Sequence, residues 1–229
     1  MDLSRALPGL GRTWWSVELP GYRPADGTYG TFDYGGLPTI EASLDDSLDW
    51  LRSAPDVAGS LAEEDIPPAR EATLAQLDEL EGPATAALPA SFRIFVGSRA
   101  LQAKVRSCTA CYLDLGEFTV PVVGGGRLIH FLSDQQWVLH WLLYVGDDGS
   151  QAVVATTDPL GFTPDEDAPA SVAGPWIPDT NSTVVVAETF EEFLYRFWIE
   201  NEIWFALADP DGARPLRPQE ARYVAHYRG

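Results

Sequence analysis

The sequence contains little cysteine and histidine and no long apolar run. It has 2 Cys and 3 His in 229 residues. The two cysteines, Cys108 and Cys111, are too few for a disulfide scaffold, which favours a reducing compartment. No stretch approaches the ~20 apolar residues that a membrane-spanning helix needs, and residues 1–15 hold no apolar run of signal-peptide length. We therefore expect a cytoplasmic protein that makes no contact with a membrane.

Basic residues are scarce as well. There are 15 Lys and Arg against 34 Asp and Glu, which gives a formal net charge of −19. Such a field repels the phosphates of nucleic acids and the anionic headgroups of lipids. It attracts a basic protein surface, although an acidic excess also serves solubility alone. Nucleic acid is thus not an expected partner, and a basic protein partner or simple solubility explains the charge.

The length fits one domain with an accessory segment. Residues 1–60 are rich in Gly, Pro and aromatic residues, and we expect them to pack on a main domain of residues 61–229. Within the accessory segment the pattern predicts a strand over 13–19, a loop over 21–36 and a short helix over 43–53. The accessory segment therefore has little regular structure of its own.

The main domain begins with helices and continues with strands. A helix is expected from Pro67 to Gly82 and a second over 89–96. Six runs then show the β-branched, aromatic or alternating pattern of strands: 111–115, 118–123, 127–132, 137–145, 151–157 and 183–187. Glycine-rich turns between them favour an antiparallel meander, and 137–145 is apolar on both faces, as in a central strand. The predicted fold class is α+β: a mainly antiparallel sheet of about five or six strands flanked by helices.

A long helix follows the last strand, over residues 189–207. Thr189 and Glu192 form a capping box at its start. One apolar stripe faces the sheet, and a second stripe, made of Tyr195, Ile199 and Ile203, lies well away from it. An ordinary surface helix is polar on that side. We expect the N-terminal segment to cover this second stripe, and we keep its three residues as partner-binding candidates in case they are exposed.

Charged segments supply further candidates. Asp165, Glu166 and Asp167 stand among prolines, which is typical of a solvated loop, and their charge makes them a second partner-binding candidate. The tail from residue 209 is the one basic region, with a helix predicted over 218–227. In so acidic a chain, its natural partner is the acidic surface of its own fold.

The order of these motifs is similar to that of a known family. Leu88, Pro89 and Phe92 enter a short helix, antiparallel strands follow, and the run 184–187 precedes the segment TFEEFL at 189–194. This order resembles the SUKH superfamily over about residues 66–207. The resemblance implies a SUKH-like, non-enzymatic interaction domain without a cofactor, of a kind widespread among bacterial toxin-immunity proteins and found in eukaryotic regulatory proteins. It makes this chain an expected immunity or regulatory protein.

Few residues indicate other chemistry. Cys108 and Cys111 have the spacing of a redox dithiol or of half a zinc site, and only His130 and His140 lie near them in sequence. We expect two inert, partly buried thiols and a histidine packed in the core. The alternatives left open are a zinc-stabilised or thiol-switch domain and a small-molecule binder that uses the Trp-rich sheet. No residue is expected to be catalytic, and no metal site is expected beyond the weak cysteine candidates.

Overall fold

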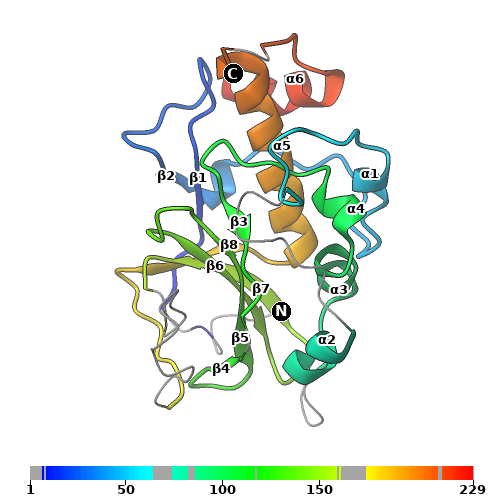
Figure 1. The fold of residues 1–229 in the computed structure, drawn as a ribbon. Coiled ribbons are helices and arrows are strands. Elements are labelled where there is room, and N and C mark those ends of the chain that lie inside the picture. Colours follow the sequence, from blue (N-terminus) through cyan, green and yellow to red (C-terminus); the bar gives the residue numbers. More distant parts are fainter. Residues whose placement is uncertain are drawn as a thin grey trace.

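The structure, a computed structural model, describes residues 7, 9–63, 74–81, 86–116, 118–158, 160, 174–210 and 213–228. Its fold is α+β, which confirms the predicted class: a six-stranded antiparallel sheet and a two-stranded sheet are flanked by helices (Figure 1). Among the described helices, none is both long and apolar enough to cross a bilayer.

The main sheet is built from sequential antiparallel strands. Four strands form its body and two short ones pair with β5: β3 (Tyr112–Leu113), β4 (Val120–Pro121), β5 (Arg127–Ser133), β6 (His140–Val145), β7 (Gln151–Thr156) and β8 (Thr183–Ala187). Every residue of β6 is buried between β5 and β7, as expected of a central strand. The predicted strand over 137–145 nevertheless begins only at His140. Trp137 has a φ of 58° and its N–H donates to the Asp134 carbonyl at 2.9 Å, so this end of the run forms a turn.

Helices cover one face of the sheet. The long helix α5 (Phe190–Ala208) and the short helix α3 (Ala90–Val96) pack there. The ring of Phe190 lies 5.0 Å from that of Phe92 on α3 and 5.3 Å from that of Phe131 on β5, measured between centroids. The opposite face is covered by loop side chains, including Val122 and Trp176. Both faces of the sheet are therefore removed from water, which accounts for its apolar strands.

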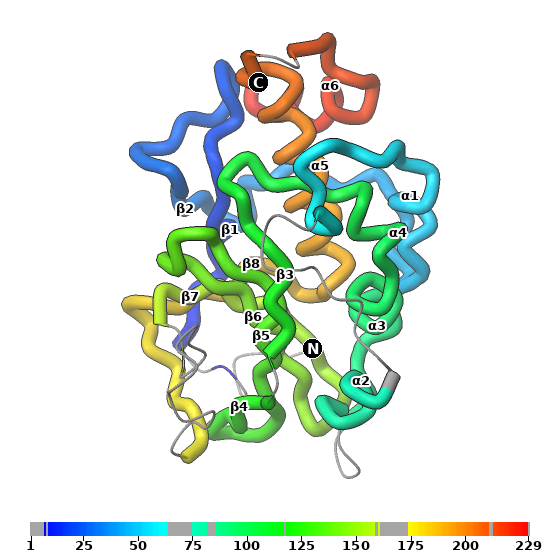
Figure 2. The backbone as a smooth tube through the Cα atoms, in the orientation of Figure 1, coloured from blue at the N-terminus to red at the C-terminus, as the bar shows by residue number. Residues whose placement is uncertain are grey.

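The N-terminal segment contains a strand pair. β1 (Thr13–Ser16) pairs with β2 (Gly30–Asp33), where the sequence predicted a loop over 21–36. That prediction is wrong for β2, because Gly30 and Asp33 carry no strand signal and only the pairing with β1 makes them extended. β1 also lies beside β8, joined by a parallel bridge between Arg12 and Val185 (Figure 2).

The predicted helix over 43–53 is much shorter in the structure. Helix α1 spans only Asp49–Arg52, and a 3-10 turn over Tyr34–Gly36 precedes it. Asp46 and Leu48 have φ values of 66° and 58°, which no helix allows. Their backbone N–H groups instead donate to the buried carboxylate of Glu191 on α5, at 2.6 and 3.2 Å. A tertiary contact therefore replaces the local capping that the sequence predicted.

The remaining helices are short. They are α2 (Leu74–Glu81), α4 (Arg99–Gln102), α6 (Pro218–Ala225) and a terminal 3-10 turn (His226–Arg228). The start of the predicted helix before Gly82 lies outside the described residues, α4 was not predicted, and α6 agrees closely with the predicted helix over 218–227. Figure 1 shows α6 packed across the end of α5 that is remote from the sheet.

The cap of α5 gives a direct test of the local argument. Thr189 Oγ1 accepts the Glu192 N–H at 3.1 Å, while the Glu192 carboxylate reaches back to the Glu188 N–H at 3.2 Å. We expect Thr189→Ala to lower the free energy of unfolding by about 1 kcal/mol in urea titrations, since an orphan donor at the helix start loses its partner.

Ser43 provides the matched control, because it is exposed and lies outside any helix. Ser43→Ala should change the free energy of unfolding by less than about 0.5 kcal/mol. Equal losses for the two alanine variants would contradict the assignment of the cap.

Candidate functional site

Glu200, in the second half of α5, is a buried carboxylate that accepts four side-chain hydrogen bonds. Its side chain is completely buried. One oxygen accepts from Trp14 Nε1 at 2.8 Å and from Arg23 Nη2 at 2.7 Å, and the other accepts from Arg23 Nη1 at 2.7 Å and from the Tyr223 hydroxyl at 2.8 Å. A buried carboxylate is tolerated only when its oxygens are satisfied in this way. Glu200 thereby joins the N-terminal segment, α5 and α6.

The basic tail is held by a second group of carboxylates. Arg214 and Arg217 both contact Glu202 on α5 and Glu220 on α6, with N–O distances from 2.6 to 3.1 Å. Arg106 reaches Glu202 as well, at 2.6 Å. The hydrogen bonds from Arg214 and Arg217 lower the pKa of Glu220, although its burial opposes them. The tail thus pairs with the acidic side chains of its own fold, as expected.

The second stripe of α5 is buried. Tyr195 is 7% exposed, and Ile199 and Ile203 are 0% exposed. The N-terminal segment covers part of the stripe, because the Trp50 ring packs 5.0 Å from that of Tyr195. The cover expected from the N-terminal segment is present, and α6 adds Tyr223 to the same core. Ile199 and Ile203 have no side-chain surface open to a partner in this structure, whereas Tyr195 lines the groove described next. The role of the three residues as partner contacts stays a prediction.

A groove lies where the N-terminal segment, α5 and α6 meet. Its volume is about 220 Å³ and it is open to solvent. Its walls are formed by seven residues: Glu41, Ala42, Trp50, Tyr195, Trp198, Gln219 and Arg222. The volume falls below the roughly 300–1,000 Å³ of pockets for drug-sized ligands. The groove therefore suits a single side chain better than a cofactor.

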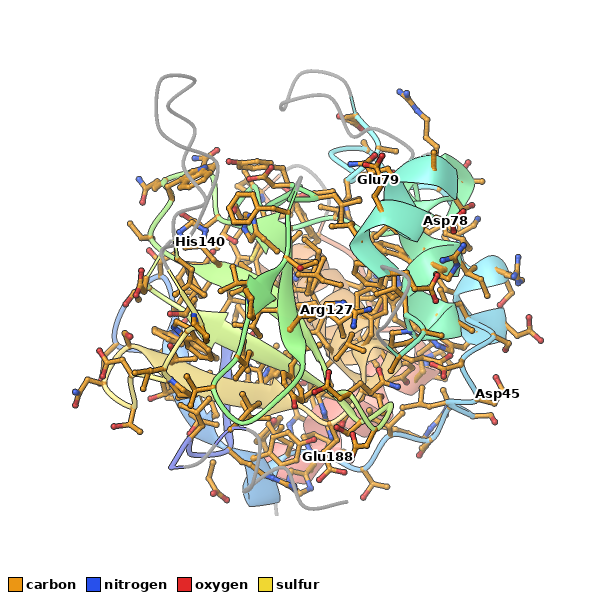
Figure 3. All side chains as sticks on the ribbon, turned by 90° about the horizontal axis from the view of Figure 1, so that it is seen from below. Asp45, Asp78, Glu79, Arg127, His140 and Glu188 are labelled. Carbon is orange, nitrogen blue, oxygen red and sulfur yellow. The ribbon has the colours of Figure 1, made fainter. Side chains whose placement is uncertain are left out.

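Outward carboxylates gather on the side of the molecule formed by α1 and α2. Asp45, Asp49, Asp78 and Glu79 are all exposed there, and we call these four residues the acidic face. The side chains of Asp49 and Asp78 are 79% and 66% exposed. Figure 3 shows Asp45, Asp78 and Glu79 on one side of the molecule, opposite His140. Of these four residues, Asp49 is the one next in sequence to a residue of the groove, Trp50.

The two cysteines are held as thiols. Cys111 is buried and its sulfur lies 3.3 Å from Thr109 Oγ1 and 3.5 Å from the Tyr29 hydroxyl. The N–H of Cys108 donates to Asn201 Oδ1 at 2.7 Å, which gives that buried amide a partner. Burial raises the pKa of the Cys108 thiol to about 12, and that of Cys111 also rises. Thiols with such pKa values are poor nucleophiles and poor metal ligands at neutral pH.

No group of three or more His, Cys, Asp and Glu side chains is placed to hold a metal ion within the described residues. Neither His130 nor His140, the two histidines nearest to the cysteines in sequence, joins Cys108 and Cys111 in such a group. The geometry thus gives the zinc alternative no further support.

The histidines belong to a buried polar row at one end of the sheet. Ser133 Oγ lies 2.8 Å from His130 Nε2 and 3.0 Å from His140 Nδ1. His130 Nδ1 is 3.7 Å from Asp114 Oδ2, which is too long for a hydrogen bond. Ser133 is 0% exposed, so the order Ser–His–Asp does not make a usable nucleophile. Burial keeps both rings neutral: the pKa of His130 falls to about 3, and that of His140 is also lowered.

The last sequence candidates, Asp165, Glu166 and Asp167, lie outside the described residues.

Comparison of the chain with known protein families, curated proteins and solved structures finds no match. The resemblance to the SUKH superfamily therefore stays a prediction.

The sequence did not single out Glu200 or the groove, although one signal was available for Glu200. Phe193 and Phe197 lie on the buried stripe of α5, and Glu200 follows them at helical spacing. A carboxylate on a buried stripe requires donors, just as the buried Asn201 does. The groove left no such signal, because its walls come from segments far apart in the sequence.

The buried histidines predict acid sensitivity. Their folded pKa values lie below the ~6.5 of an exposed histidine, so the unfolded chain binds more protons as the pH falls below 6.5. This contribution to stability is complete above pH 6.5 and is lost on acidification. Between pH 6 and pH 5, wild type should lose about 1 kcal/mol more free energy of unfolding than His130→Gln does.

The exposed ring of His226 supplies the control. His226→Gln should follow the pH dependence of wild type in the same urea titrations. A His130→Gln profile parallel to that of wild type would show that His130 is not held neutral in the fold.

Proposed function

We propose that this chain is a non-enzymatic protein-binding module that recognises a basic partner through its acidic face. The observation that carries the proposal is the uneven use of charge in the fold. Most described basic side chains form ion pairs within the molecule: Arg12, Arg23, Arg52, Arg93, Lys104, Arg106, Arg196, Arg214, Arg217 and Arg222. The net charge of −19 already counts all 15 Lys and Arg, so the chain carries many more carboxylates than its own cations can neutralise.

The acidic face is one of the places where this excess points to solvent. Arg52 and Arg93 pair with Asp49 and Asp78, but these contacts are largely exposed and contribute little. The Asp45 carboxylate accepts hydrogen bonds from the hydroxyl and the N–H of Ser47, which lower its pKa. A basic protein surface meeting this face would gain both encounter rate and specificity.

The SUKH resemblance, if it reflects common descent, makes the module an immunity or regulatory protein. Immunity proteins bind a toxin, and a toxin-like gene beside the gene for this chain would favour that role. Its absence would favour a general regulatory role. In both cases the chain works by binding, and we assign it no catalytic residue and no cofactor.

Two other functions are less favoured. A thiol switch needs a reactive thiolate, whereas burial raises the pKa of Cys108 to about 12. An enzyme built on the sheet needs an accessible nucleophile, whereas Ser133 and the histidines beside it are buried. A binding function needs neither a reactive thiolate nor a nucleophile, because an exposed surface is sufficient for it.

Neutralising the acidic face tests the proposal. Binding partners should be captured from host cells on the wild-type chain and on a variant with Asp45→Asn, Asp49→Asn, Asp78→Asn and Glu79→Gln. We expect the variant to capture about tenfold less partner than wild type, or less still. Capture by wild type should also weaken as salt is added, because salt shortens the screening length.

A second variant with the same change in net charge serves as the control. It neutralises four exposed carboxylates elsewhere: Glu18→Gln, Asp26→Asn, Asp33→Asn and Asp147→Asn. This control should capture the partner as wild type does. Equal capture by all three chains would refute the acidic face, and equal loss by both variants would show that only net charge matters.

A further inference from the structure

The groove between α1, α5 and α6 has an aromatic floor. The ring centroids of Trp50 and Tyr195 lie 5.0 Å apart at an interplanar angle of 71°, and those of Trp50 and Trp198 lie 5.3 Å apart at 50°. Rings at such angles set the face of one beside the edge of the next. An aromatic face carries negative electrostatic potential and attracts cations, most strongly in tryptophan.

One of these rings, that of Trp198, already contacts a cation, although that cation does not line the groove. The guanidinium carbon of Arg217 lies 5.7 Å from the centroid of the Trp198 ring. That distance is within the roughly 6 Å over which a cation and a ring attract each other. The floor of the groove is therefore chemically suited to a guanidinium or ammonium group.

The rim of the groove carries one carboxylate and one cation. Glu41, from the N-terminal segment, pairs with Arg222 on α6 at 2.7 Å. Their side chains are 60% and 56% exposed. An exposed pair of this kind holds its partners weakly and exchanges them readily. The guanidinium of Arg222 thus pairs with the Glu41 carboxylate, and an incoming cation can take its place in that ion pair.

We propose that the groove binds one lysine or arginine side chain of the basic partner, with its cation against Trp50, the least buried of the three rings, and paired with Glu41 in place of Arg222. The inference rests on the proposed function and adds the chemistry of the contact. The lining holds one carboxylate, Glu41, and one cation, Arg222, so the preference for a cation comes from the net charge of −19, which favours the approach of a cation over that of an anion.

An anionic ligand in the same groove would interact with the two rim charges in the opposite way. It would pair with Arg222 and be repelled by Glu41. The two ligand classes therefore predict opposite effects for the two rim substitutions, Glu41→Gln and Arg222→Gln. Both side chains are exposed, so neither substitution disturbs the core.

The test uses a defined peptide and the full chain. A blocked pentapeptide with a central arginine among glycines is titrated while NMR follows the indole N–H signals of Trp50 and Trp198. A matched peptide with central glutamine gives the background. We expect saturable shifts with the arginine peptide only, about three- to tenfold weaker binding to Glu41→Gln, and tighter binding to Arg222→Gln.

The control is Glu18→Gln, which removes the same charge from an exposed position outside the groove lining. It should bind the arginine peptide as wild type does. Equal shifts with both peptides, no shift, or a reversed order of the Glu41 and Arg222 variants would overturn the proposal. Because this titration needs no native partner, it can fail while capture through the acidic face succeeds, and the reverse also holds.

Discussion

The buried carboxylate of Glu200 is the constraint on which the arrangement of this chain depends. A carboxylate taken out of water is costly, and here Trp14, Arg23 and Tyr223 offset the cost by donating to both oxygens. The first two donors come from the N-terminal segment and the third from α6. The two ends of the chain therefore have to meet on α5, and their meeting buries the second apolar stripe of that helix.

Features that depend on neighbouring residues were predictable, and features that depend on distant ones were not. The cap at Thr189, the strands β5 to β8 and helix α6 follow from local patterns. The donors to Glu200 are 177 and 186 residues away along the chain for Arg23 and Trp14, so no local pattern announces them. The same holds for the short α1, whose start is set by Glu191, and for the groove, whose walls come from three separate segments.

Internal pairing also shapes the surface. Glu200, Glu202 and Glu220 take up basic side chains from both ends of the chain, so the carboxylates of the acidic face keep most of their charge toward solvent. The pair of Glu41 and Arg222 is one of the ion pairs that lie at the surface. The fold and the proposed binding thus depend on the same interaction. The carboxylates of this chain pair either with its own arginines or with the cations of a partner.

The central claim, that one carboxylate couples the two ends of the chain, is tested most directly by a double-mutant cycle. Trp14→Phe and Tyr223→Phe each remove one donor to Glu200 and leave an aromatic ring at the position. Urea unfolding of wild type, both single variants and the double variant yields the coupling free energy. Donors that share one buried carboxylate should be coupled by about 0.5 kcal/mol or more. Additive losses, with no coupling, would contradict the account.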